Sequence, residues 1–177
     1  MSVSENDDPF TIRELKASDA DAVLHIYQQG IDTGHATFQE ELPSWEEWDA
    51  SHLETPRLGA FIGETLAGWA MLSPTSSRCV FTGVAEESVY IGKEYGGRGI
   101  GFALLEALSK ASEEQGIWTL LAGIFPENEA SVKLHLKAGF RIVGTREKMG
   151  KMSFGPLAGK WRDVLFMERR STAEQYK

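Results

Sequence analysis

The chain has 177 residues, of which 42% are hydrophobic and 25% charged, proportions typical of one soluble globular domain. Its formal net charge of −8 argues against a nucleic-acid partner, because neutralising phosphates requires a surplus of lysine and arginine. No apolar run approaches the roughly 20 residues needed to span a bilayer, and residues 1–9 are too polar and acidic for a secretory signal. We therefore expect a disordered lead-in over 1–9, one domain over 10–170 and a tail over 171–177. The single cysteine, Cys79, excludes an intramolecular disulfide and favours a cytoplasmic location.

The first half of the chain predicts a strand, two helices and a β-hairpin. Apolar and polar residues alternate over 10–15, as in a half-buried strand. A helix capped by Ser18 or Asp19 follows, and we expect Gly30 to end it. Pro43 and the acidic residues after it predict the start of a second helix. Two β-prone runs, 58–64 and 67–72, form the expected hairpin.

The second half of the chain alternates strands and helices. The β-prone run 88–91 indicates a central strand, and the apolar stripe of 100–115 indicates an amphipathic helix. The near-continuous apolar run 118–125 is typical of a strand covered on both faces. A helix over 128–138 and two further strands, starting at Phe140 and Asp163, complete the order βααβββαβαββ. This order predicts an α/β domain with a mixed sheet of about seven strands.

Three glycines at alternate positions, Gly97, Gly99 and Gly101, separate the central strand from the amphipathic helix. Glycine lets backbone N–H groups approach a ligand, and the first helical turn offers unpaired donors and partial positive charge. The segment therefore predicts a phosphate site with Arg98 at its rim; a tight turn without a ligand is the alternative. The residues after Gly101 lack the lysine of a P-loop, and the glycine spacing does not match a dinucleotide fingerprint.

The glycine loop 96–101, the strand 118–125 and the run from Asn128 to Ser131, with Gly139-Phe140 beyond it, occur in a recognisable order. In this order they resemble the Gcn5-related N-acetyltransferase (GNAT) superfamily. The resemblance implies the acyl-CoA N-acyltransferase fold, with helices on both faces of a sheet splayed at its centre, and acetyl-CoA as cofactor. Gly96 stands where the superfamily motif has arginine or glutamine. Because the superfamily holds the pyrophosphate largely by backbone N–H groups, this departure weakens the expected site without abolishing it.

Finer features are similar to the phosphinothricin and methionine sulfoximine acetyltransferase branch of that superfamily. They are the run 36–38, Arg78-x-x-Phe81, the strand 86–91, Leu134-His135 and the run 159–163. The branch implies a small amino-acid-like acceptor and a homodimer. The run 149–158 departs from the shorter loop expected near the acceptor.

The resemblance also implies roles for individual residues. Glu86 would be the general base that deprotonates the acceptor amine, and His135 would help the coenzyme A thiolate to leave. The remaining cofactor contacts would come from the central strand, the glycine loop and the following helix: Val89, Tyr90, Ile91, Gly96, Gly97, Arg98, Gly99, Ile100, Gly101, Asn128 and Ser131. The acceptor would meet Thr37, Phe38, Arg78 and Phe81, with Arg78 holding its carboxylate.

Most of these residues also have a purely structural alternative. For Glu86 the alternative is a solvated loop acid, and a lone helical histidine such as His135 is usually structural. Asn128 can simply cap its helix, and Arg78 can be a surface arginine. The other histidines lack metal-ligand spacing, so we expect no metal.

The sequence therefore predicts direct acetyl transfer from acetyl-CoA to the primary amine of a small amino-acid-like acceptor. Acetylation of a protein N-terminus or a polyamine is one alternative. A non-catalytic acyl-CoA-binding module, suggested by Gly96, is another.

Overall fold

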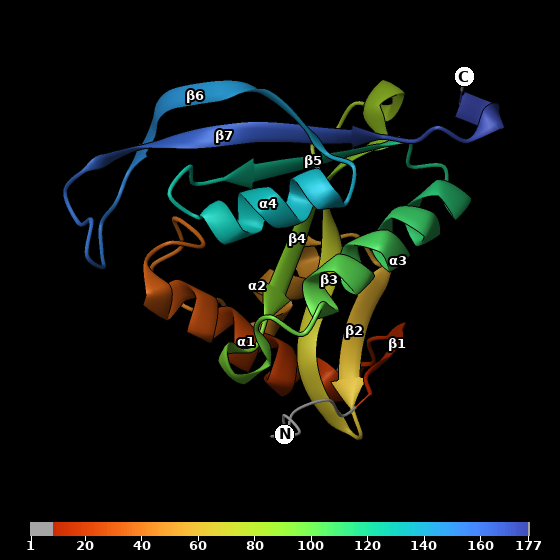
Figure 1. The fold of residues 1–177 in the computed structure, drawn as a ribbon, viewed down its shortest axis with the longest axis horizontal. Helices are drawn as coiled ribbons and strands as arrows, with labels where there is room; N and C mark the ends of the chain where they lie inside the picture. Colours follow the sequence, from red (N-terminus) through yellow and green to blue (C-terminus); the bar gives the residue numbers. More distant parts are fainter. Residues whose placement is uncertain (1–8, 177) are drawn as a thin grey trace, which may run out of the picture.

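A seven-stranded mixed sheet runs through the computed structural model, which describes residues 9–176 (Figure 1). The lead-in expected over 1–9 lies outside the described residues apart from Pro9. The sheet order is β1-β2-β3-β4-β5-β7-β6, and every neighbouring pair is antiparallel except β4 with β5. The strands are β1 (Thr11–Glu14), β2 (Arg57–Ile62), β3 (Thr65–Pro74), β4 (Val84–Ile91), β5 (Thr119–Ile124), β6 (Arg141–Lys151) and β7 (Trp161–Arg170).

In the described part of the chain, four α-helices cover the sheet in the order that the sequence predicts. They are α1 (Ala20–Thr33), α2 (Trp45–Ser51), α3 (Ile100–Glu114) and α4 (Glu129–Lys137). Single-turn 3₁₀ helices occur at Ala17–Asp19, Cys79–Phe81, Lys93–Tyr95 and Glu174–Tyr176. The expected α/β order and fold class are confirmed.

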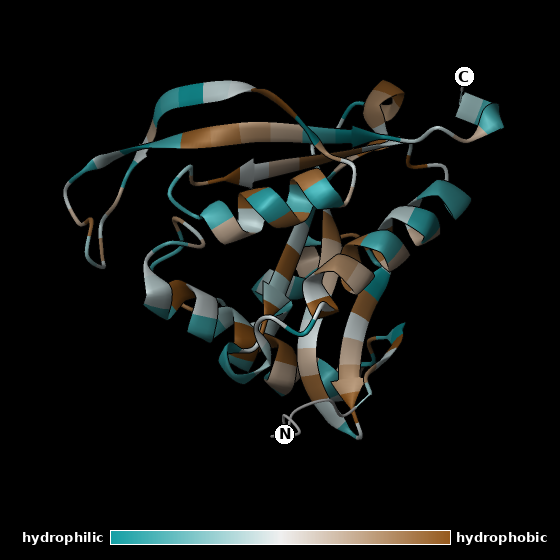
Figure 2. Ribbon diagram, viewed as in Figure 1, coloured by the Kyte–Doolittle hydropathy of each residue, from teal (hydrophilic) through white to brown (hydrophobic). Residues whose placement is uncertain are grey.

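Side chains of β3 alternate between two hydrophobic cores, one on each face of the sheet. Trp69 and Met71 pack in a cluster with residues of α1 and α2. Ala70 and Leu72 belong to the larger cluster, which contains the apolar stripe of α3. Successive residues of a strand point to opposite faces, so one strand serves both layers. Figure 2 shows that α3 carries both hydrophobic and hydrophilic residues, and its buried hydrophobic residues belong to the larger cluster.

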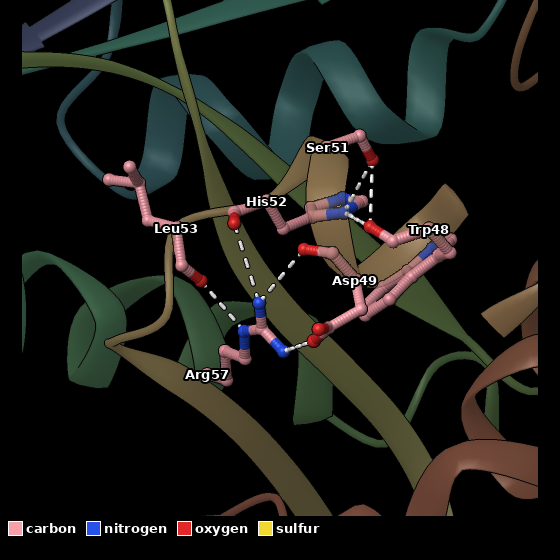
Figure 3. A network of polar contacts seen from close by, with 6 residues as sticks. All are labelled: Trp48, Asp49, Ser51, His52, Leu53 and Arg57. Carbon is pink, nitrogen blue, oxygen red and sulfur yellow. Dashed lines mark hydrogen bonds and ion pairs between the residues drawn. The ribbon is translucent and has the colours of Figure 1, made fainter. Parts of the chain in front are cut away.

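Helix α2 is fixed to the start of β2 by Arg57 (Figure 3). The guanidinium donates to the carbonyl oxygen of Leu53 at 2.7 Å and forms an ion pair with Asp49. The ring of His52 stacks on Trp48 with centroids 4.0 Å apart, and its Nδ1 donates to the Trp48 carbonyl oxygen at 2.6 Å. These contacts hold the short helix against the α1 face, where Trp48 is 2% exposed.

Helix α1 does not end at Gly30, contrary to the prediction from sequence. It continues to Thr33, and Gly34 ends it in the left-handed conformation with φ of 66°. Gly30 has a packing role instead, because an added Cβ would lie 2.6 Å from Cε1 of Tyr90.

The last two strands are longer than predicted and form a hairpin that bends toward the end of α1 (Figure 1). The unexpected run 149–158 lies at its tip. The tip meets the segment after α1, since Ser153 Oγ donates to Glu40 at 2.7 Å and a Cβ on Gly150 would touch the Phe38 ring. Beyond the hairpin, residues 171–176 fold back, and the Tyr176 hydroxyl donates to the Glu113 carbonyl oxygen at 2.8 Å.

Buried Arg162 joins the hairpin to α1. Its side chain is 1% exposed and donates to the carbonyl oxygen of Gly34 at 2.8 Å. It also pairs with Glu127 at 3.1 Å, and its guanidinium lies 3.5 Å above the Phe125 ring centroid. The tip, the α1 terminus and the end of β5 are thereby held together.

Candidate active site

A cleft opens where the two parallel strands at the centre of the sheet diverge. β4 pairs with β3 over Ala85–Ile91, but its register with β5 extends only from Val84 to Glu86. No strand within residues 9–176 covers the other edge of β4 beyond that point. In Figure 1, β4 runs upright while β5 crosses the top of the molecule. The cleft has a volume of about 1350 Å³ and contacts both strands, α1, α4 and the glycine loop.

Most of the residues predicted for the site line this one cleft. They are Thr37, Phe38, Glu86, Val89, Tyr90, Ile91, Gly96, Gly97, Gly99, Ile100, Gly101, Asn128, Ser131 and His135. Arg78, Phe81 and Arg98 are not among the lining residues.

The glycine loop adopts the open conformation that an anion site requires. Gly97 and Gly99 have φ of 78° and 77°, which favours glycine, and Gly99 is the N-cap of α3. No atom lies within 4 Å of an ideal Cβ on Gly96, Gly97 or Gly99, so a ligand can approach the backbone closely. Gly101 has a different role, since its Cβ would lie 2.9 Å from Leu134 of α4. It allows the two helices to pack closely.

Glu86 stands on β4 at the point where the cleft begins. Its Oε1 is 3.7 Å from the position of a Cβ on Gly123, so the absence of a side chain there leaves room for the carboxylate. Partial burial raises the pKa of Glu86, and the charge of Glu87 raises it further, while Arg146 acts in the opposite direction. A carboxyl group with a raised pKa, open to the cleft, is suited to accept a proton.

Glu87 points to the opposite face and pairs with His135, a contact that the sequence did not reveal. Its Oε1 lies 2.6 Å from Nε2 of the histidine, and both side chains are at most 3% exposed. The other ring nitrogen, Nδ1, donates to the Ser131 carbonyl oxygen at 2.7 Å. Burial lowers the pKa of His135, but the hydrogen bond and charge of Glu87 outweigh it, so the pKa is raised overall.

The predicted proton donation from His135 to a leaving thiolate stays a prediction, and the structure shows what it would require. Both of its ring nitrogens already have protein partners, and the residue is 1% exposed. Direct donation would require one of these hydrogen bonds to break. His135 and Glu87 both line the cleft, so the pair lies beside the ligand space.

Asn128 caps α4, as its structural alternative predicts. Its Oδ1 accepts from the Ser131 N–H at 3.2 Å, while its Nδ2 lies 3.5 Å from the His35 carbonyl oxygen. Asn128 and Ser131 also line the cleft. Capping therefore fixes the start of α4 beside the ligand space.

Arg78 and Phe81 form their own pair away from the cleft, with the guanidinium 5.3 Å from the ring centroid. The cleft instead receives side chains from the last hairpin: Arg146, Met149, Val164 and Phe166. Of these, sequence reasoning placed only the run that begins at Met149 near the acceptor. No local motif marks them, because their place depends on the register of β6 with β7.

A sheet that splays beside a glycine loop and a helix N-terminus defines the class of acyl-CoA-dependent acyltransferases. The model of the acetyltransferase (GNAT) family matches residues 21–140. The chain belongs to this family and is an acetyl-CoA-dependent acyltransferase.

Two enzymes and one solved structure indicate the branch of the family. A phosphinothricin N-acetyltransferase of Streptomyces viridochromogenes is 32% identical, with 91% of this chain and 87% of that protein covered. An L-methionine sulfoximine/L-methionine sulfone acetyltransferase of Pseudomonas paraeruginosa is also 32% identical, with 89% and 92% covered. A phosphinothricin acetyltransferase of Sinorhizobium meliloti in complex with AcCoA matches with a TM-score of 0.81 and 28% identity, over 95% of this chain and 92% of that one.

Proposed function

We propose that the protein acetylates the primary amine of a small amino-acid-like acceptor, of the phosphinothricin or methionine sulfoximine type, by direct transfer from acetyl-CoA. The observation that carries the proposal is the position of Glu86 at the point where β4 and β5 diverge. The names of the relatives supply the acceptor class.

The residues of the cleft fit the cofactor. The first-turn N–H groups of α3 and the open backbone of Gly97 and Gly99 suit the pyrophosphate. The edge of β4 that faces β5 has no strand partner over 87–91 within residues 9–176, so it offers backbone groups to the amides of the pantetheine arm. When bound there, acetyl-CoA supplies an acetyl group activated as a thioester.

The chain's own groups then carry out the proton transfer and the stabilisation of charge. Glu86 accepts the proton of the acceptor ammonium, directly or through water, and leaves a neutral amine that can attack the carbonyl carbon. Backbone N–H groups of β4 stabilise the negative charge that develops on the carbonyl oxygen. Coenzyme A would leave as a thiolate, and His135, which pairs with Glu87 beside the cleft, would help it to leave by exchanging one of its hydrogen bonds for one to the sulfur.

A thiol-release assay with acetyl-CoA tests the proposal. Phosphinothricin, L-methionine sulfoximine and L-methionine sulfone serve as acceptors, with a polyamine and a short peptide as competitors, and mass spectrometry identifies the products. We expect acetylation of an amino-acid-like acceptor. Exclusive acetylation of the polyamine or the peptide, or no thiol release with any acceptor, would sink the proposal.

The variant Glu86→Gln isolates the chemical step. It should lower kcat by about 10²- to 10⁴-fold, the usual contribution of a general base, with unchanged binding of coenzyme A in calorimetry. Glu106→Gln removes an equivalent charge from the exposed face of α3 and serves as the control. Equal rates for the two variants would exclude Glu86 as the base.

Two further features of the proposed enzyme are its assembly and its location. The branch resemblance supports a homodimer, which light scattering after size-exclusion chromatography tests directly. A cytoplasmic location agrees with the single cysteine. None of the helices within residues 9–176 is long and apolar enough to cross a membrane. Fluorescence of a tagged chain in fractionated cells would check the location.

A further inference from the structure

Arg146 on β6 is placed to meet an acceptor bound at Glu86. It stands opposite Val164 in the β6–β7 register, and a methyl carbon of Val164 lies 3.3 Å from the position of a Cβ on Gly123. Oε1 of Glu86 is 3.7 Å from that same position. The absence of a side chain at Gly123 therefore leaves a gap between the Glu86 carboxylate of β4 and the Val164 side chain of β7.

The guanidinium of Arg146 leans over β7 toward this gap. Its Cζ lies 4.3 Å from the ring centroid of Phe166, and Phe166 pairs in register with Gly123. Ring stacking occupies one face of the guanidinium and leaves its N–H edges available. Within residues 9–176 the Arg146 guanidinium makes no protein hydrogen bond or ion pair, so those donors can serve a ligand.

The charges near the gap match the two charged groups of an α-amino acid. Glu86 is anionic when it acts as base, and Arg146 is close enough for its charge to lower the pKa of that carboxyl. The two lysines that line the cleft lie elsewhere. Lys93 begins the turn before the glycine loop, and the Nζ of Lys137 lies 4.5 Å from the ring centroid of Phe102 on α3.

We infer that Arg146 binds the carboxylate of the acceptor while Glu86 receives the proton of its amine, so that Arg146 selects amino acids over simple amines. The inference rests on the proposed function and replaces the role expected of Arg78. An α-amino acid carries its amine and carboxylate on one carbon, so two opposite charges beside one gap bind both groups together. A guanidinium can hold a carboxylate by two parallel hydrogen bonds.

The test is a calorimetric titration of the protein saturated with coenzyme A, which measures binding without turnover. The probes are L-methionine sulfone and its carboxamide, which lacks the negative charge. We expect the wild type to prefer the acid by about 10- to 100-fold, the range for a hydrogen bond to a charged group. Arg146→Ala should bring the two affinities within about threefold of each other, and Arg146→Lys should restore part of the preference.

Two matched variants complete the design. Lys151→Ala removes an exposed charge from the same strand, and Arg78→Ala tests the residue expected from sequence. Both should retain the preference for the acid. A preference unchanged in Arg146→Ala, or lost only in Arg78→Ala, would overturn the inference. Carboxylate-dependent binding without acetyl transfer would support Arg146 and overturn the proposed function, so the two failures are distinguishable.

Discussion

Two adjacent carboxyl groups on β4 have different surroundings because a strand turns successive side chains to opposite faces. Glu86 opens into the cleft, whereas Glu87 is 6% exposed and paired with a histidine. The charge of buried Glu87 nevertheless contributes to the raised pKa of Glu86. The family resemblance pointed to Glu86 alone, and the structure adds the contacts that distinguish it from Glu87.

The raised pKa of Glu86 predicts the pH dependence of catalysis. A general base acts when deprotonated, so kcat/KM should fall as the pH falls through a value above the ordinary pKa of glutamate. Arg146→Ala removes a positive charge that lowers this pKa, so the acidic limb should move to higher pH. Initial rates between pH 5 and 9 would check this, and a limb that moves to lower pH would contradict it.

The pair of Glu87 and His135 predicts a pH-dependent contribution to stability. The folded-state pKa of His135 is raised above its unfolded value near 6.5, so the contribution is complete below about pH 6.5. It is lost as the pH rises through the folded pKa. His135→Gln should lower the free energy of unfolding by about 3 kcal/mol at pH 6, with a smaller loss at high pH. Urea unfolding across this range is the measurement, and a difference independent of pH would count against the pair.

At the scale of elements, close approach explains two glycines better than turn formation does. Gly30 lets α1 lie against Tyr90, whose ring stacks on Trp69 with centroids 4.9 Å apart and meets Tyr27 edge to face at 5.1 Å. Gly101 lets α3 and α4 approach. A sequence shows that a residue is glycine, but the neighbour that requires it comes from another element.

Gly30→Ala should destabilise the protein although alanine favours helix formation by about 1 kcal/mol. The added Cβ would lie 2.6 and 2.7 Å from two carbons of Tyr90, and the ring contacts leave Tyr90 little room to move. Overpacking costs about 1–3 kcal/mol, so we expect the melting temperature to fall by about 3–6 °C. Gly144→Ala is the control, because its Cβ would meet no atom within 4 Å. A variant at position 30 as stable as this control would refute the packing role.

On the scale of the whole molecule, the long β6–β7 hairpin closes one side of the acceptor end of the cleft. Its tip rests on the segment after α1, and Arg162 ties it to Gly34 and Glu127. The acceptor wall therefore depends on residues more than 120 positions apart, since the Arg162–Gly34 contact spans 128 positions.

Arg162→Met should loosen this wall. We expect a loss of about 2–4 kcal/mol in unfolding free energy, because the substitution removes the hydrogen bonds of a buried guanidinium to Gly34, His35 and Glu127. The KM for the acceptor should rise while the KM for acetyl-CoA stays the same, since the glycine loop is distant in the fold. Arg170→Ala, at an exposed site on the same strand, should change stability by less than about 0.5 kcal/mol. Equal increases in both KM values would show that the hairpin does not act on the acceptor alone.

The sequence alone determined the element order, the α/β class and the glycine loop with its helix. These features rest on local signals: period-two and period-3.6 apolar patterns, caps, and glycines that permit positive φ. The motif order also pointed to Glu86 and to most of the cleft-lining residues, because β4, the loop and α4 lie near one another in the chain as well as in space.

Only the tertiary structure decided which side chains share the cleft with Glu86. Strand register placed Phe166 opposite Gly123 and Arg146 opposite Val164, and Arg78 does not line the cleft. Packing of α4 on the sheet gave His135 its partner Glu87. Register and helix packing follow from contacts between residues far apart in the chain, on which local patterns carry no information.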